Sequence, residues 1–173
     1  LPILNKYTYI HQNPLDTFPI ENTNLTAQIF QLSHGNPYIG SALWVSSGKS
    51  SVLYLGDTGA DRIEKSNQLD TLWKTIAPWI KDHSLKAILI EVSFPNSQPE
   101  NSLFGHLTPA LLQEELENLA SYTGKENLKN FPVIITHLKP SGANIETIKR
   151  ELQNGNKLGV TLIFPVQGEK INL

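Results

Sequence analysis

The second half of the chain alternates short apolar segments with longer helical patterns, and this alternation limits the folds open to it. The segments "KAILIE" and "PVIIT" are continuous apolar runs of strand length. Each is followed by a stretch whose apolar residues recur every three or four positions. Because strands that alternate with helices favour a sheet covered by helices, we expect an α/β (α+β) fold with a mixed β-sheet flanked by helices. We expect residues 1–173 to form a single domain.

The same patterns bound the individual elements. Apolar runs and turn residues predict strands over 26–32, 39–45, 51–55, 86–91, 131–136 and 160–164. Helical spacing and end signals predict helices over 67–80, 109–123 and 144–155. The first of these helices is expected to have Ser66 or Asn67 as its N-cap, and the second is expected to be capped by Thr108.

Ionisable residues stand where several predicted strands end. Asp57 follows "VLYLG", Glu91 ends "KAILIE", His137 follows "PVIIT" and His34 follows "AQIFQLS", while His106 lies on the long loop "SFPNSQPENSLFGHLTP". Because parallel strands deliver their carboxyl ends to one edge of a sheet, we expect these groups to converge there. Imidazoles and a carboxylate without thiols suit a divalent metal such as zinc or manganese.

Each residue also has a purely structural interpretation. Asp57 between glycines is typical of a turn, a single histidine at a strand end is usually a hydrogen-bonded structural residue, and Glu91 could serve only as an ion-pair partner. "GHLTP" could be no more than the start of a helix. A functional site is favoured because these coincidences all fall at the same topological place.

Composition excludes several classes of protein. A hydrophobic content of 39% is typical of a soluble globular domain, and a net charge of −2 with scattered signs argues against nucleic acid or an anionic membrane as a partner. No apolar run approaches the roughly 18 to 20 residues of a membrane span. The chain has no cysteine, which excludes disulfides, thiolate ligands and a cysteine nucleophile. The compartment, cytoplasmic or periplasmic, stays open.

Seven short motifs point to a family. The segments "LSHG", "SALWV", "LYLGDTGAD", "LWKTIAPWI", "IEVSFPNSQPE", "LFGHLTP" and "ITHLKP" occur in this order. From about position 28 onward the chain resembles the class II cyclic nucleotide phosphodiesterases, a branch of the metallo-β-lactamase fold. The resemblance implies an αββα sandwich with a dinuclear metal site at its edge, of which this chain would supply mainly the second half. It also implies hydrolysis of 3',5'-cyclic AMP, or a related cyclic nucleotide, to the 5'-monophosphate by a hydroxide that two divalent metal ions activate, zinc or alternatively manganese.

The resemblance further implies roles for five residues. His34 would complete the imidazole set of the first metal, Asp57 would bridge both metals, and His137 would be the terminal ligand of the second. Glu91 and His106 resemble an acid and histidine pair of the related tRNA-processing nucleases. In that pair, His106 would give a proton to the leaving 3'-oxygen and Glu91 would orient it.

One departure from the family pattern affects the whole interpretation. The first ligand motif of the fold, H-x-H-x-D-H, does not occur in these residues, so the ligand set is incomplete. The sequence contains no methionine, and we expect the other half to precede Leu1 in the protein or to have been cleaved. These residues alone are then expected to be inactive. Two alternatives stay open: another hydrolase of the fold such as a tRNA-processing nuclease, or an inactive module kept for packing or homodimer formation.

Overall fold

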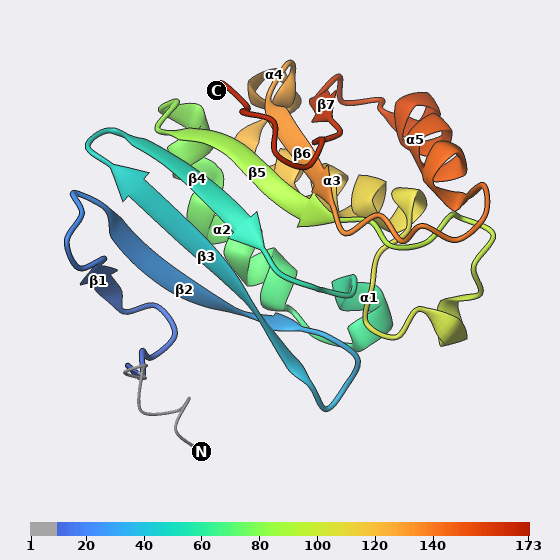
Figure 1. Ribbon diagram of the computed structural model, residues 1–173, viewed down its shortest axis with the longest axis horizontal. Helices are drawn as coiled ribbons and strands as arrows, with labels where there is room; N and C mark the ends of the chain where they lie inside the picture. The colour runs from blue at the N-terminus through green and yellow to red at the C-terminus, as the bar shows by residue number, and fades with distance from the viewer. Residues whose placement is uncertain (1–9) are drawn as a thin grey trace.

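The computed structural model describes residues 10–173, which form a seven-stranded sheet with helices (Figure 1). The strands are β1 (Thr17–Pro19), β2 (Thr26–Ser33), β3 (Ile39–Ser47), β4 (Ser50–Leu55), β5 (Leu85–Glu91), β6 (Pro132–Thr136) and β7 (Thr161–Ile163). The helices are α1 (Asp61–Glu64), α2 (Gln68–Lys81), α3 (Pro109–Thr123), α4 (Lys125–Leu128) and α5 (Asn144–Gly155), with a 3₁₀ turn at Glu100–Ser102.

The sheet is mixed, and its strands lie side by side in chain order. Strands β1 to β4 pair antiparallel, whereas β4, β5, β6 and β7 pair parallel. Each parallel step needs a crossover, which α2, α3 with α4, and α5 provide in turn. The predicted mixed sheet with helices is therefore confirmed, and the carboxyl ends of β4, β5 and β6 share one edge.

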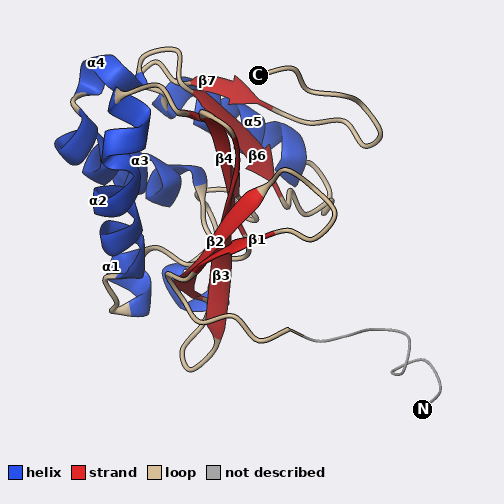
Figure 2. Ribbon diagram, turned by 90° about the vertical axis from the view of Figure 1, so that its left-hand side faces the viewer, coloured by secondary structure: helices blue, strands red, loops and turns tan. Residues whose placement is uncertain are grey.

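Helices α2 and α3 cover one face of this sheet (Figure 2). In β4, Leu53 and Leu55 are fully buried toward the helices, while Tyr54 between them is 48% exposed. Burying each such apolar side chain contributes about 1.5 to 3 kcal/mol. Among residues 10–173 there is a single sheet, so these residues form one sheet-and-helix layer of the expected sandwich.

The helix ends follow the sequence in one case and depart from it in another. The predicted cap of α3 is confirmed, since the Thr108 hydroxyl accepts a hydrogen bond from the Leu111 amide at 3.3 Å. Asn67 occupies the N-cap position of α2 as expected, but its side chain makes no capping hydrogen bond. No helix in the described range is both long and apolar enough to cross a membrane.

The Asp61 carboxylate, which belongs to α1, caps α2 instead. It accepts hydrogen bonds from the amides of Leu69 at 3.2 Å and Asp70 at 2.8 Å, and from the Ser66 hydroxyl at 2.6 Å. A carboxylate next to a helix N-terminus is also favoured by the helix dipole. Asn67 is therefore the N-cap residue, as predicted, but the side-chain acceptor at this helix end is Asp61, because the chain folds back between α1 and α2.

Glu115 on α3 connects three helices inside the core. Its carboxylate accepts the Trp73 indole N–H at 3.0 Å and the Asp61 amide at 3.0 Å. The side chain is buried, and this desolvation raises the pKa of Glu115 above its ordinary value, although both hydrogen bonds act in the opposite direction. Folding therefore favours the neutral form of this carboxyl group.

We predict that Glu115→Gln reduces the loss of stability at rising pH. Because the folded-state pKa lies above the unfolded one, the contribution of Glu115 is fully present below the unfolded pKa and is lost as pH rises through the folded pKa. Glutamine carries no charge at any pH, so the free energy of unfolding of the variant should lack the part of its pH dependence that comes from Glu115. The substitution also replaces one of the two acceptor oxygens of Glu115. Urea unfolding between about pH 4 and 8 measures the difference. Parallel pH profiles for both proteins would contradict it.

Candidate metal centre and active site

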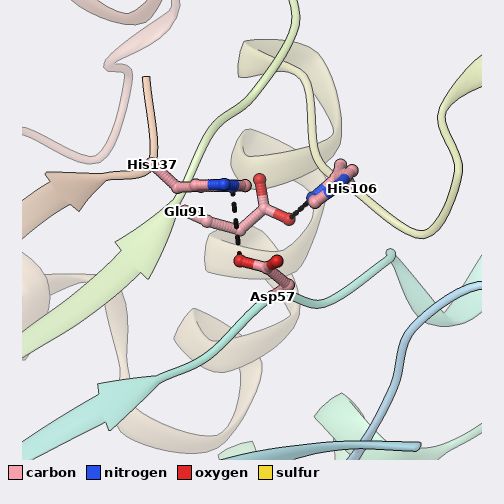
Figure 3. A group of neighbouring side chains, drawn as sticks. All are labelled: Asp57, Glu91, His106 and His137. Carbon is pink, nitrogen blue, oxygen red and sulfur yellow. Dashed lines mark hydrogen bonds and ion pairs between the residues drawn. The ribbon is translucent and has the colours of Figure 1, made fainter. Parts of the chain in front are cut away.

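The ends of β4, β5 and β6 bring the predicted polar residues together (Figure 3). Asp57 lies two residues after β4, Glu91 is the last residue of β5, and His137 directly follows β6. Together with His106, which comes from the loop before α3, they offer ligand atoms that all lie within 4.8 Å of one another. The convergence that the strand ends predicted is therefore present in the structure.

The Glu91 carboxylate is buried and fully hydrogen-bonded. Its Oε1 accepts the His106 Nδ1–H at 2.6 Å and the Thr58 amide at 3.3 Å. Its Oε2 accepts the Ser93 hydroxyl at 2.7 Å and the Leu107 amide at 3.4 Å. A carboxylate whose two oxygens are both occupied in this way orients its neighbours and has little capacity left to bind a metal.

The Ser93 hydroxyl connects Glu91 to His137. Since its only proton goes to Glu91, its oxygen accepts from the His137 Nδ1–H, which lies 3.0 Å away. His137 Nδ1 is also 3.3 Å from Asp57 Oδ1. His137 has a φ of 54°, a left-handed backbone conformation. Its ring points toward Asp57 (Figure 3).

His34 lies beside this group but is not one of its four members. Its Nδ1 donates a hydrogen bond to the Gly105 carbonyl at 2.9 Å, and its ring centroid is 4.9 Å from that of His106. The contact requires glycine at position 105, because a Cβ there would lie 2.3 Å from the Gly35 amide nitrogen and 2.8 Å from His34 Nδ1. Gly105 also has a φ of +79°.

The donor set fits a divalent cation. His34, His106 and His137 each engage Nδ1, so each leaves Nε2 as the nitrogen that can face a metal or a substrate. The Asp57 carboxylate is 42% exposed, and its Oδ1 lies 3.3 Å from His137 Nδ1. Imidazole and carboxylate ligands of this kind suit zinc or manganese.

Sequence reasoning did not single out Thr58, Ser93 or Gly105. Ser93 stands two residues after Glu91 and Thr58 directly follows Asp57, so proximity in the chain was the available signal. Gly105 precedes His106 in "FGHLTP", and its need for a positive φ could not be read from the sequence. The metal-ligand role of His34, Asp57 and His137, and the catalytic role of His106, Glu91 and Asp57, remain predictions.

Comparison with solved structures identifies the fold. The chain superimposes on the metallo-β-lactamase fold protein YhfI from Bacillus subtilis with a TM-score of 0.62 and 15% identity, over 98% of this chain and 60% of that one. It superimposes on unliganded yeast PDE1 with a TM-score of 0.79 and 26% identity, over 91% of this chain and 48% of that one. The protein therefore has the metallo-β-lactamase fold, as predicted.

Sequence comparison then gives the family. Residues 4–168 match the family model described as cAMP phosphodiesterases class-II. The chain is 41% identical to a 3',5'-cyclic-nucleotide phosphodiesterase of Aliivibrio fischeri over 172 residues. This aligned region covers 97% of this chain and 52% of that protein. It is 36% identical to 3',5'-cyclic-nucleotide phosphodiesterase 1 of Saccharomyces cerevisiae over 110 residues, and this aligned region covers 61% of this chain and 30% of that protein. The chain belongs to the class II cAMP phosphodiesterase family, and it spans about half the length of the Aliivibrio relative.

We predict that Gly105→Ala destabilises the fold by about 2 kcal/mol or more, because it adds both left-handed backbone strain and a steric conflict. Gly48→Ala is the matched control, since Gly48 has a φ of +59° but open space around its Cβ position. The difference between the two variants in urea unfolding reports the close approach of Gly105 to His34. Equal losses in both variants would show that only the backbone strain matters.

Proposed function

We propose that the protein containing this chain hydrolyses a 3',5'-cyclic nucleotide, with cyclic AMP as the first candidate, to the 5'-monophosphate. The observation that carries the proposal is the buried pair of His106 and Glu91, joined at 2.6 Å, beside the more exposed pair of Asp57 and His137. Family membership supports the same reaction.

In this proposal the buried pair of His106 and Glu91 supplies the proton that the leaving oxygen needs. Glu91 accepts from His106 Nδ1, which fixes the ring and leaves Nε2 to face the leaving 3'-oxygen. A protonated Nε2 gives its proton to that oxygen as the bond to phosphorus breaks. Glu91 acts through His106 and is a positioning residue.

The exposed pair belongs to the metal site. We assign Asp57, His137 and His34 as ligands for divalent cations, zinc or manganese, which when bound supply Lewis-acid activation of water and neutralise charge on the phosphoryl oxygens. These residues are too few to complete two coordination shells. We propose that the other ligands come from residues outside this chain, which would then be the C-terminal part of the enzyme.

Charge favours a small substrate over RNA. The chain carries a net charge of −2, whereas proteins that track nucleic acid usually present basic stripes. A direct comparison of cyclic AMP, cyclic GMP and precursor tRNA as substrates for the product of the complete gene tests this proposal. Cleavage of the tRNA alone would replace the proposed function with that of a nuclease.

His106→Ala should lower kcat for a cyclic nucleotide by about 10²- to 10⁴-fold, the usual contribution of a general acid. The loss should be much smaller for bis(p-nitrophenyl) phosphate, because p-nitrophenolate leaves without being protonated. Bound metal should stay largely intact in this variant. Equal losses on both substrates, or loss of metal along with activity, would remove the proton-donor role from His106.

Asp57→Ala should lose most of the metal that the purified protein binds, because the variant lacks the carboxylate assigned to it. Asp82→Ala is the matched control, since Asp82 is a surface residue at the C-terminal end of α2 and does not belong to the candidate metal site. Metal content by inductively coupled plasma mass spectrometry measures both variants. Unchanged stoichiometry and affinity in Asp57→Ala would contradict its assignment as a ligand.

A further inference from the structure

One hydroxyl lies between the buried pair and the exposed pair of the site. The Ser93 side chain is fully buried, and its Oγ lies 2.7 Å from Glu91 Oε2 and 3.0 Å from His137 Nδ1. The backbone fixes its place, because the Ser93 amide donates to the Leu107 carbonyl at 3.1 Å. The mechanism above gives this residue no role.

The partner of Nδ1 differs among the three histidines of the site. His34 donates to a backbone carbonyl and His106 donates to a carboxylate, and both kinds of partner can only accept. The nearest partner of His137 is a hydroxyl, which can accept or donate. The tautomer of the His137 ring therefore depends on where the Ser93 proton points.

The charge of Glu91 decides this direction. A carboxylate has no proton to give, and the His106 ring and the Thr58 amide already donate to its other oxygen. The Ser93 proton points to Oε2 rather than to the His137 carbonyl, which is 3.4 Å from Ser93 Oγ. The Ser93 oxygen then accepts from His137 Nδ1–H, so Nε2 of His137 carries the lone pair that a cation needs.

Asp57 acts on the same nitrogen, but less directly. Its Oδ1 is 3.3 Å from His137 Nδ1, farther than Ser93 Oγ, and its side chain is 42% exposed whereas Ser93 is fully buried. Asp57 is itself assigned as a ligand, so a bound cation competes for its oxygens. Ser93 is then the acceptor that keeps the proton on Nδ1.

We infer that Ser93 is a positioning residue that relays the negative charge of Glu91 to the metal ligand His137. One carboxylate sets two rings at once, because it holds His106 directly and His137 through the Ser93 hydroxyl. The proton donor and the metal site are thereby coupled, and a change at Glu91 alters the affinity for metal. The inference rests on the proposed function only for the assignment of His137 as a ligand, and its test needs no turnover.

Competition with a chromophoric chelator measures the zinc affinity of the product of the complete gene. Ser93→Ala should weaken zinc binding about 10- to 100-fold, the usual effect of losing a hydrogen-bond partner of a ligand. Glu91→Gln should also weaken it, because an amide that donates to Ser93 turns the hydroxyl proton toward His137 Nδ1. The double variant should bind zinc about as weakly as Ser93→Ala alone, since both substitutions interrupt one chain of hydrogen bonds.

Ser51→Ala is the matched control. Ser51 is 4% exposed and its hydroxyl donates to the Ser84 carbonyl at 3.1 Å, but it lies near the start of β4, at the end of the strand remote from Asp57. This variant should bind zinc as the unaltered protein does. An equal loss in Ser51→Ala and Ser93→Ala would show that any missing buried hydroxyl has this effect, and would overturn the inference.

The other variants separate the relay from a purely structural role. Ser93→Thr keeps the hydroxyl and should retain most of the zinc affinity, and a loss equal to that of Ser93→Ala would overturn the inference. Unchanged zinc affinity in Ser93→Ala would show that Asp57 alone holds the His137 proton, and the relay would fall. Additive losses in the double variant would have the same consequence, because Ser93 and Glu91 would then act independently.

Hydrolysis assays distinguish this inference from the proposed function. If the unaltered protein hydrolyses no cyclic nucleotide while the zinc losses are non-additive, the proposed function fails and the relay stands. If cyclic AMP is hydrolysed and the zinc losses are additive, the relay fails and the function stands. Absence of zinc binding by the unaltered protein overturns the relay together with the assignment of His137 as a ligand.

Discussion

The site depends on the satisfaction of one buried charge, the carboxylate of Glu91. Its side chain is 1% exposed, and an ion removed from water in this way needs hydrogen-bond donors that replace its hydration. The donors come from Thr58 after β4, from Ser93 after β5 itself, and from His106 and Leu107 on the loop before α3. One carboxylate therefore fixes the relative positions of three connecting segments, and through Ser93 it also holds His137.

The parts of this arrangement that follow from strand direction could be predicted from the sequence. Apolar runs identified β4, β5 and β6, and their alternation with helices indicated parallel pairing, so Asp57, Glu91 and His137 had to reach one edge of the sheet. Burial of β5 and β6 by the helices that follow them leaves few other registers open to the strands.

The contacts made by loops could not be derived in the same way. Asp61 caps α2, although it lies six residues before the predicted cap, Asn67, and Gly105 approaches His34 across 71 positions of sequence. Both contacts depend on where a connecting segment folds back, and neither leaves a periodic pattern. The motif "FGHLTP" pointed to His106, but the hydrogen bond that gives its ring a defined orientation exists only once β5 and this loop have packed together.

Exposure divides the site into two parts with different physical tasks. The His106 and Glu91 side chains are 8% and 1% exposed, whereas those of His137 and Asp57 are both 42% exposed. The enclosed pair keeps a fixed geometry because protein groups satisfy the Glu91 carboxylate and hold His106 through Nδ1, while Nε2 of His106 stays available. The open pair retains ligand capacity because its burial is incomplete. The two parts are nevertheless in contact, through the Ser93 hydroxyl, through the His106 and His137 rings, whose centroids are 5.1 Å apart, and through the Thr58 amide next to Asp57. A change at the open pair is therefore transmitted to the proton donor.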